Sequence, residues 1–184
     1  MLRMIGSPGQ MPSATLSPHP TTPCRALRAI RVSVDRDGAV LRVDYVLEGD
    51  TQGLRIPAPR PPRAADELWK HTCCELFVAR PGARDYREFN FSPSGEWAAY
   101  RFSSYREGRA AVDTLPTIAV ERASGRFSLT ARVSVGEEKV VLGLSVVIED
   151  ENGALSYWAL RHAPGEPDFH HPQAFAMELD AIRH

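Results

Sequence analysis

The segment from Leu68 to Phe102 holds the side chains with the clearest chemical potential. It begins Leu-Trp-Lys-His-Thr-Cys-Cys-Glu-Leu-Phe and, beyond Pro81-Gly82, reads Glu-Phe-Asn-Phe-Ser-Pro-Ser-Gly-Glu-Trp. Two of the three tryptophans, Trp69 and Trp97, lie within it. An indole ring stacks on the apolar C–H face of a sugar, and carboxylate and amide groups hydrogen-bond hydroxyls. These residue types favour binding of a carbohydrate-like small molecule.

Alternation along two strands predicts how these groups are presented. If residues 69–77 are extended, one face carries Trp69, His71 and Glu75. In the next strand, polar side chains occupy the face opposite to two phenylalanines. Pairing of the strands around Pro81-Gly82 would bring Glu75 and Asn90 within reach of each other. The candidate ligand-binding residues of this segment are Trp69, His71, Glu75, Glu88, Asn90, Ser92 and Trp97.

A second group of aromatic and basic residues lies late in the chain, at a strand end and in the Pro-rich loop that follows. Loops that are positioned by a rigid scaffold are common places for binding residues. We therefore expect this group to supply the second half of the site. Its candidate ligand-binding residues are Trp158, Arg161, His162, His170 and His171.

The histidines and cysteines raise the question of a metal. No pair of histidines has the spacing of a ligand pair, and the adjacent His170 and His171 point in different directions in an extended chain. We therefore predict no metal site, with a metal-binding protein as the alternative that the four histidines His71, His162, His170 and His171 suggest. Cys73 and Cys74 are neighbours in a chain with three cysteines, which cannot form an even set of disulfides, so we expect reduced, buried thiols.

Catalysis is a weaker interpretation of the same residues. The sequence has no phosphate-binding glycine loop, no nucleophile elbow and no zinc-binding helix motif. Acid–base work by Glu75 with His71 or His162 is an alternative, but no carboxylate pair or nucleophile–base spacing is visible. We predict a binding protein without catalytic residues.

The composition limits the partners. The chain has 184 residues, with 22 basic against 23 acidic side chains. This balance argues against nucleic acid or an anionic membrane as the main partner, because both reward a concentrated basic face. No segment resembles a signal peptide, and the longest nearly apolar run is only residues 140–148. We expect a cytoplasmic protein without a membrane partner.

Short strands must position these residues. Alternating patterns predict hairpins over residues 30–47 and 117–135, and further strands at 140–148, 155–160 and 175–179. Residues 54–63 are rich in proline and arginine, which indicates a long crossover loop between two sheets. Eight to ten strands without helical periodicity predict an all-β fold, an antiparallel β-sandwich of the jelly-roll type.

The domain organisation follows from a change in composition near residue 24. Residues 1–23 are rich in Pro, Ser, Thr and Gly without any period. Such a segment buries little apolar surface, so we predict a flexible Pro-rich arm that is separate from the core. Residues 24–184 then form a single domain.

Three stretches carry a family resemblance: the two in the segment 68–102, and Ser-Tyr-Trp-Ala-Leu-Arg-His with Pro-Asp-Phe-His-His-Pro over residues 156–172. With these motifs, residues 24–184 resemble bacterial DOMON-like domain proteins. That family is related to family 9 carbohydrate-binding modules and to haem-binding DOMON domains. The resemblance implies a jelly-roll sandwich that binds a sugar or haem.

Individual residues can be matched to these relatives. Trp69 resembles the stacking aromatic of the sugar-binding modules, Glu75 their ligand-bonding glutamate, and Trp158 loosely their late aromatic. Asn90 and Ser92 fall where those modules place polar sugar contacts. Haem-binding relatives pair a methionine with a basic or histidine ligand. Here Met177 is predicted in a core strand and the other methionines in the arm, so the resemblance favours no cofactor, with haem as the alternative through His162, His170 or His171.

Overall fold

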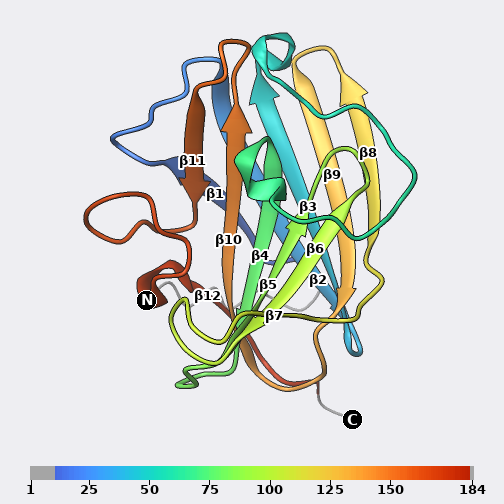
Figure 1. Cartoon of the computed structure of the whole chain (residues 1–184), viewed down its shortest axis with the longest axis vertical. Helices are drawn as coiled ribbons and strands as arrows, with labels where there is room; N and C mark the ends of the chain where they lie inside the picture. The colour runs from blue at the N-terminus through green and yellow to red at the C-terminus, as the bar shows by residue number, and fades with distance from the viewer. Residues whose placement is uncertain (1–10, 183–184) are drawn as a thin grey trace.

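The computed structural model describes residues 11–182, and these form an almost entirely antiparallel β-structure (Figure 1). Twelve strands are joined by loops that include three single-turn 3₁₀ helices, η1 (Thr51–Gly53), η2 (Leu68–Lys70) and η3 (Pro172–Ala174). Within this part of the chain no helix is long and apolar enough to cross a membrane. The predicted all-β, sandwich-like fold is confirmed.

The strands form two sheets that share one strand. The β3 sheet has the order β1 (Ser13–Pro18), β2 (Leu27–Asp37), β3 (Val40–Gly49), β9 (Arg126–Ser134) and β8 (Thr117–Ala123). The β4 sheet has the order β7 (Ala110–Ala111), β6 (Trp97–Phe102), β5 (Tyr86–Phe91), β4 (Cys73–Ala79), β10 (Val140–Glu149), β11 (Leu155–Ala159) and β1, and β12 (Met177–Leu179) pairs with β10.

The shared strand, β1, lies inside the segment that we expected to be a flexible arm. Its first residues pair with β2, and Ser17 and Pro18 pair with β11 of the other sheet. Leu16 is 1% exposed and belongs to the core. The prediction of an arm separate from the core is therefore wrong for β1, because one buried leucine and backbone pairing suffice to hold so short a strand. The first ten residues of the predicted arm lie outside the described residues.

The main core fills the space between the sheets. The predicted hairpins are present as β2–β3 and β8–β9, and their inward residues meet those of β4, β5 and β10. Phe89 and Phe91 point into this core, as their alternation predicts. Strand β10 is buried along nearly its whole length because it has strands on both sides and covering residues on both faces.

The crossover from β3 to β4 follows the prediction at first and then departs from it. Residues 55–63 form no strand and carry the chain from one sheet to the other. We expected the next strand to include Trp69, but it begins at Cys73. Glu67 takes a left-handed backbone conformation with φ of 60°, and the chain turns through η2 before entering β4. Trp69 and His71 are therefore not part of the β4 alternation.

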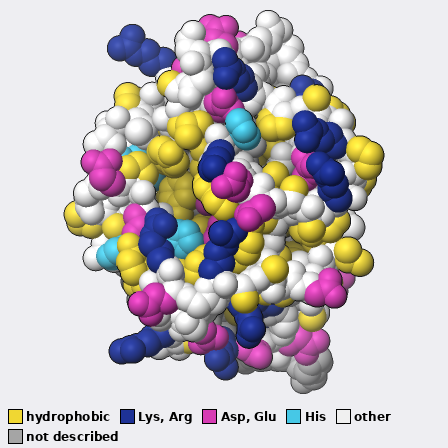
Figure 2. All heavy atoms as spheres, in the orientation of Figure 1, with side chains coloured by type: hydrophobic (Ala, Val, Ile, Leu, Met, Phe, Trp, Pro, Cys, Tyr) yellow, Lys and Arg dark blue, Asp and Glu magenta, His cyan; other side chains and the backbone are white. Residues whose placement is uncertain are grey.

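The outer face of the β4 sheet is covered as well. Aromatic side chains from β4, β5 and β6 pack there against residues of the 160–176 loop, in a second apolar cluster that includes Phe77, Tyr86, Phe102 and Phe169. This explains why both faces of β4 are buried. Figure 2 shows this side of the molecule, with a hollow lined by hydrophobic side chains and with basic and acidic side chains gathered around it.

Candidate functional site

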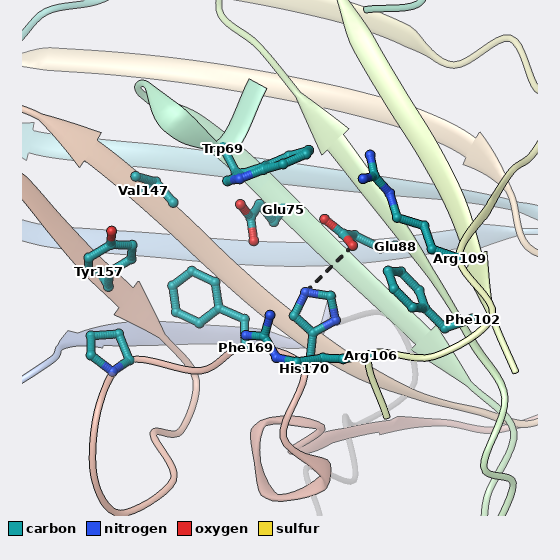
Figure 3. Close-up of a pocket in the computed structure, with 11 residues that line it drawn as sticks. Trp69, Glu75, Glu88, Phe102, Arg106, Arg109, Val147, Tyr157, Phe169 and His170 are labelled. Atoms are coloured by element: carbon teal, nitrogen blue, oxygen red, sulfur yellow. Dashed lines mark ion pairs between the residues drawn. The ribbon is translucent and has the colours of Figure 1, made fainter. Parts of the chain in front are cut away.

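A cavity of about 340 Å³ opens on the outer face of the β4 sheet, beneath η2 and the loops that follow β6 and β11 (Figure 3). Two carboxylates, four aromatic rings, two arginines and a histidine contribute to its wall. The lining residues are Trp69, Glu75, Glu88, Phe102, Arg106, Arg109, Val147, Tyr157, Pro167, Phe169 and His170. The early and late clusters of the sequence thus meet at this cavity.

The floor of the cavity is polar. Glu75 on β4 lies directly opposite Asn90 on β5, and Glu88 is two residues before Asn90 on the same face. The Asn90 side-chain amide donates to Glu88 Oε1 over 2.7 Å. On the other side, the Ser145 hydroxyl of β10 is 3.4 Å from Glu75 Oε2. The predicted meeting of Glu75 and Asn90 across the sheet is confirmed.

Both floor glutamates are protected from solvent. Glu75 is 3% exposed and Glu88 is 5% exposed. Burial raises the pKa of the Glu75 carboxyl well above its usual range, and repulsion from Glu88 adds to this effect. Burial also raises the pKa of Glu88, against the opposing hydrogen bond from Asn90. A proton on Glu75 would make it a hydrogen-bond donor beside an acceptor, which suits a ligand with hydroxyl groups.

A neutral histidine stands beside the floor. His170 Nε2 is 3.7 Å from Glu88 Oε2, and its Nδ1 shares a 2.7 Å hydrogen bond with the Tyr86 hydroxyl. The imidazole packs edge-on against Phe77 and Phe102, with 5.1 Å between the ring centroids in each case. Burial and the nearby Arg106 lower the pKa of His170 to about 4. At neutral pH it is therefore uncharged.

Trp69 forms part of the opposite wall. It sits at the centre of η2 and meets Tyr100 edge-on, with 6.3 Å between the ring centroids. The Arg109 guanidinium lies 3.9 Å from the Tyr100 ring centroid and 5.2 Å from that of Trp69. Arg109 also forms a 2.6 Å ion pair with Asp66, which accepts a hydrogen bond from the Tyr100 hydroxyl. This network fixes the wall against β6.

A second network joins the two loops at the mouth of the cavity. Arg106 forms a 2.8 Å ion pair with Asp168, and the Tyr105 hydroxyl donates to the same carboxylate over 2.6 Å. Arg106 has a positive φ of 56°. Among the described residues, the only other non-glycine with positive φ is Glu67, which precedes η2. Strained backbone of this kind gathers at functional sites, and here both residues lie in segments that build the cavity.

Several early candidates lie elsewhere. His71 Nδ1 is 2.7 Å from Glu149 Oε2, outside the cavity wall. Ser92 is buried and bonded to Ser94. Trp97 pairs with Phe91 across β5 and β6, so it faces away from the cavity.

The candidates from the late part of the chain also lie in different places, and most of them are outside the cavity. Trp158 is 3% exposed and belongs to the main core, opposite Val146, so Tyr157 lines the cavity in its place. His162 Nε2 is 2.8 Å from the Ser17 carbonyl oxygen. His171 caps η3 by accepting from the Gln173 amide, and Arg161 borders a separate hollow. Of the late candidates, only His170 reaches the cavity.

Sequence reasoning left out several lining residues. Arg106 and Arg109 belong to a short loop after β6 that has no motif, and Phe102 is the last residue of the segment 68–102, with no motif of its own. Tyr157 and Phe169 were visible as members of the late aromatic cluster. The available signal was alternation: because Val147 and Tyr157 are paired across β10 and β11, they face the cavity together while Trp158 faces the core.

The described residues do not fit haem. Met177 is buried in the core and borders the separate hollow beside Arg161, whereas His170 lines the cavity and His162 bonds to Ser17. Met177 therefore does not line the cavity that His170 lines. Within residues 11–182, no three His, Cys, Asp or Glu side chains converge to hold a metal ion.

Comparison with known proteins shows the fold. No protein-family model matches the sequence, and no curated protein is significantly similar to it. The chain is similar in structure to a crystal structure from Bacteroides uniformis that is described as a "putative carbohydrate-binding protein". The TM-score is 0.65 at 13% sequence identity, over 91% of this chain and 86% of the other. At this identity the likeness extends to the fold.

Proposed function

We propose that this protein is a non-catalytic binder of a small sugar or amino-sugar-like ligand, held in the cavity on the β4 sheet. The observation that carries the proposal is the placement of Glu75 and Glu88 on the floor of a cavity with Trp69 on its wall. Asn90, fully buried behind the floor, does not line the cavity and acts by donating a hydrogen bond to Glu88. Aromatic rings suit the C–H face of a sugar, and the floor groups suit its hydroxyls.

Other features support the proposal. The structural neighbour is described as a carbohydrate-binding protein, and the sequence motifs resemble relatives of carbohydrate-binding modules. The near balance of 22 basic and 23 acidic residues favours a small-molecule partner over nucleic acid or an anionic membrane.

The test is calorimetric titration with monosaccharides, disaccharides and cell-wall fragments. We expect saturable binding of at least one saccharide, and competition for it by related sugars. Each binding saccharide should then be titrated into Glu88→Gln, which keeps the shape of the floor and alters its hydrogen bonding. Absence of binding across the panel would overturn the proposal, as would unchanged affinity in the variant.

An acid–base enzyme is a second candidate, favoured by the two neighbouring carboxylates with raised pKa values. The predicted partners of Glu75 in such a reaction, His71 and His162, do not line its cavity. The pair would instead be Glu75 and Glu88, beside His170. Incubation with chromogenic glycosides tests this candidate: turnover that disappears in Glu75→Gln supports it, and no turnover of any glycoside counts against it.

A further inference from the structure

The two floor carboxylates differ from the other buried glutamates in lacking a strong cationic partner. Glu96 is paired with Arg63 at 2.8 Å, and Glu149 is paired with Arg55 at 3.0 Å. In the described part of the chain, no lysine or arginine forms an ion pair with Glu75 or Glu88. Buried carboxylates are normally paired, because desolvation of an isolated charge is costly. A partner is therefore missing from the floor.

The neighbouring basic groups do not fill this role. His170 is 3.7 Å from Glu88, but its pKa of about 4 leaves it neutral at physiological pH. Arg106 is paired with Asp168, and Arg109 with Asp66. Both arginines weaken the negative potential of the floor from a distance, yet each already has a carboxylate of its own. No described lysine or arginine is therefore left to pair with the two glutamates, whose raised pKa values reflect this lack, and a cationic ligand would favour their ionised form.

The aromatic walls of the cavity also suit a positively charged ligand. Trp69, Phe102, Tyr157 and Phe169 surround the floor with aromatic surface. Figure 3 shows the carboxylates of Glu75 and Glu88 side by side, with the Trp69 ring on one side of them and Phe169 on the other. Aromatic faces attract cations, most strongly where water is excluded. Carboxylates and rings together form a receptor for a positively charged group.

We propose that the ligand carries a protonated primary amine, which lies between Glu75 and Glu88 while its carbon skeleton packs against the aromatic wall. This inference rests on the proposed binding function and narrows it to amino sugars and similar hydroxylated amines. The ammonium supplies the missing cationic partner and three hydrogen-bond donors. N-acetylation of the amine removes the charge that the floor recognises.

The charge state of the floor depends on groups from every element around it. The titratable and charged groups that surround Glu75 and Glu88 are Cys73, Tyr86, Tyr100, Arg106, Arg109, Asp66, Asp168 and His170, with Tyr45 and Cys74 on the core side of β4. Amine binding favours the ionised carboxylates. We therefore expect affinity for the amine to rise with pH as long as the amine itself stays protonated.

The experiment compares glucosamine, glucose and N-acetylglucosamine by calorimetry on the full chain. A charge-assisted contact predicts that glucosamine binds at least about tenfold more tightly than the two neutral sugars. In Glu75→Gln and Glu88→Gln, this preference should fall to within about threefold, with glucose affinity less affected. Glu48→Gln, the same change on the β3 sheet, should leave the preference intact.

The outcomes separate the inference from the function on which it rests. Equal affinity for glucosamine and glucose in the wild-type protein would overturn the inference and leave carbohydrate binding standing. A preference for glucosamine that survives in both floor variants would also overturn it, since the ammonium group would then be bound by other residues. Failure of all three sugars and of the wider panel would overturn both. The wild-type comparison holds even if a floor variant fails to fold.

Discussion

Glu75 and Asn90 face each other directly across the antiparallel pair of β4 and β5, and Asn90 in turn donates to Glu88. One backbone register thus sets three polar side chains side by side on a surface that the covering loops bury. The register of the paired strands sets the spacing of these side chains, and the loops cover them.

Glu75→Gln should stabilise the protein increasingly as the pH rises. The pKa of Glu75 is raised in the folded state, so its contribution to stability is fully present below its unfolded pKa and is lost as the pH rises toward the folded value. Glutamine is neutral throughout. We expect the variant to gain about 1–3 kcal/mol on the wild type between pH 4 and pH 8 in urea unfolding. Glu48→Gln is the control, and a pH-independent difference would contradict the prediction.

His170 should produce the opposite slope at lower pH. Its folded pKa of about 4 lies below the ordinary histidine pKa of 6.5, so the folded state loses stability as the pH falls between these values. The loss should amount to roughly 2–4 kcal/mol. His170→Gln removes it, and the difference between wild type and variant isolates this group from the glutamates. Parallel stability curves for the two proteins between pH 6.5 and 4 would refute this assignment.

Trp69→Ala should weaken saccharide binding by roughly 5- to 30-fold, because the wall loses its largest ring. Trp69→Phe keeps an aromatic face and should retain part of the affinity. The stability of both variants should change little by comparison, since Trp69 is only half-buried. Leu115→Ala removes an 82% exposed apolar side chain outside the cavity wall and serves as the control in calorimetry. If Trp69→Ala binds the saccharide with unchanged affinity, the ligand does not contact this wall.

The three cysteines should differ sharply in reactivity. Cys73 and Cys74 are buried, and burial raises the pKa of both thiols, whereas Cys24 is partly exposed. A maleimide should therefore label only Cys24 in the native protein and all three residues in denaturant, as peptide mass spectrometry would show. Rapid native labelling of Cys73 would mean that the floor strand opens to solvent.

Alternation accounts for what could be predicted from the sequence. The positions of Glu75, Glu88 and Asn90 on one face, and of Phe89 and Phe91 on the other, follow from the period of two and a short turn. These residues required no knowledge of the rest of the chain. The hairpins were predictable for the same reason.

The rest of the site depends on tertiary geometry. A left-handed residue, Glu67, turns Trp69 out of the strand in which alternation placed it. Trp158 looks like a ligand contact by residue type, yet register with Val146 directs it to the core and brings Tyr157 to the cavity. Arg106 and Arg109 reach the site from a loop whose path is set by ion pairs with distant residues. Local pattern carries no information on such long-range contacts.

Strand β1 has a practical consequence for the design of shortened proteins. Because its six residues pair with β2 at one end and with β11 at the other, their removal would uncover two strand edges at once. Unprotected edges template pairing between molecules. A protein that starts at residue 24, where the composition suggests a boundary, should therefore be prone to self-association and strand exchange. A protein that starts before Ser13 keeps β1, which covers the edges of β2 and β11.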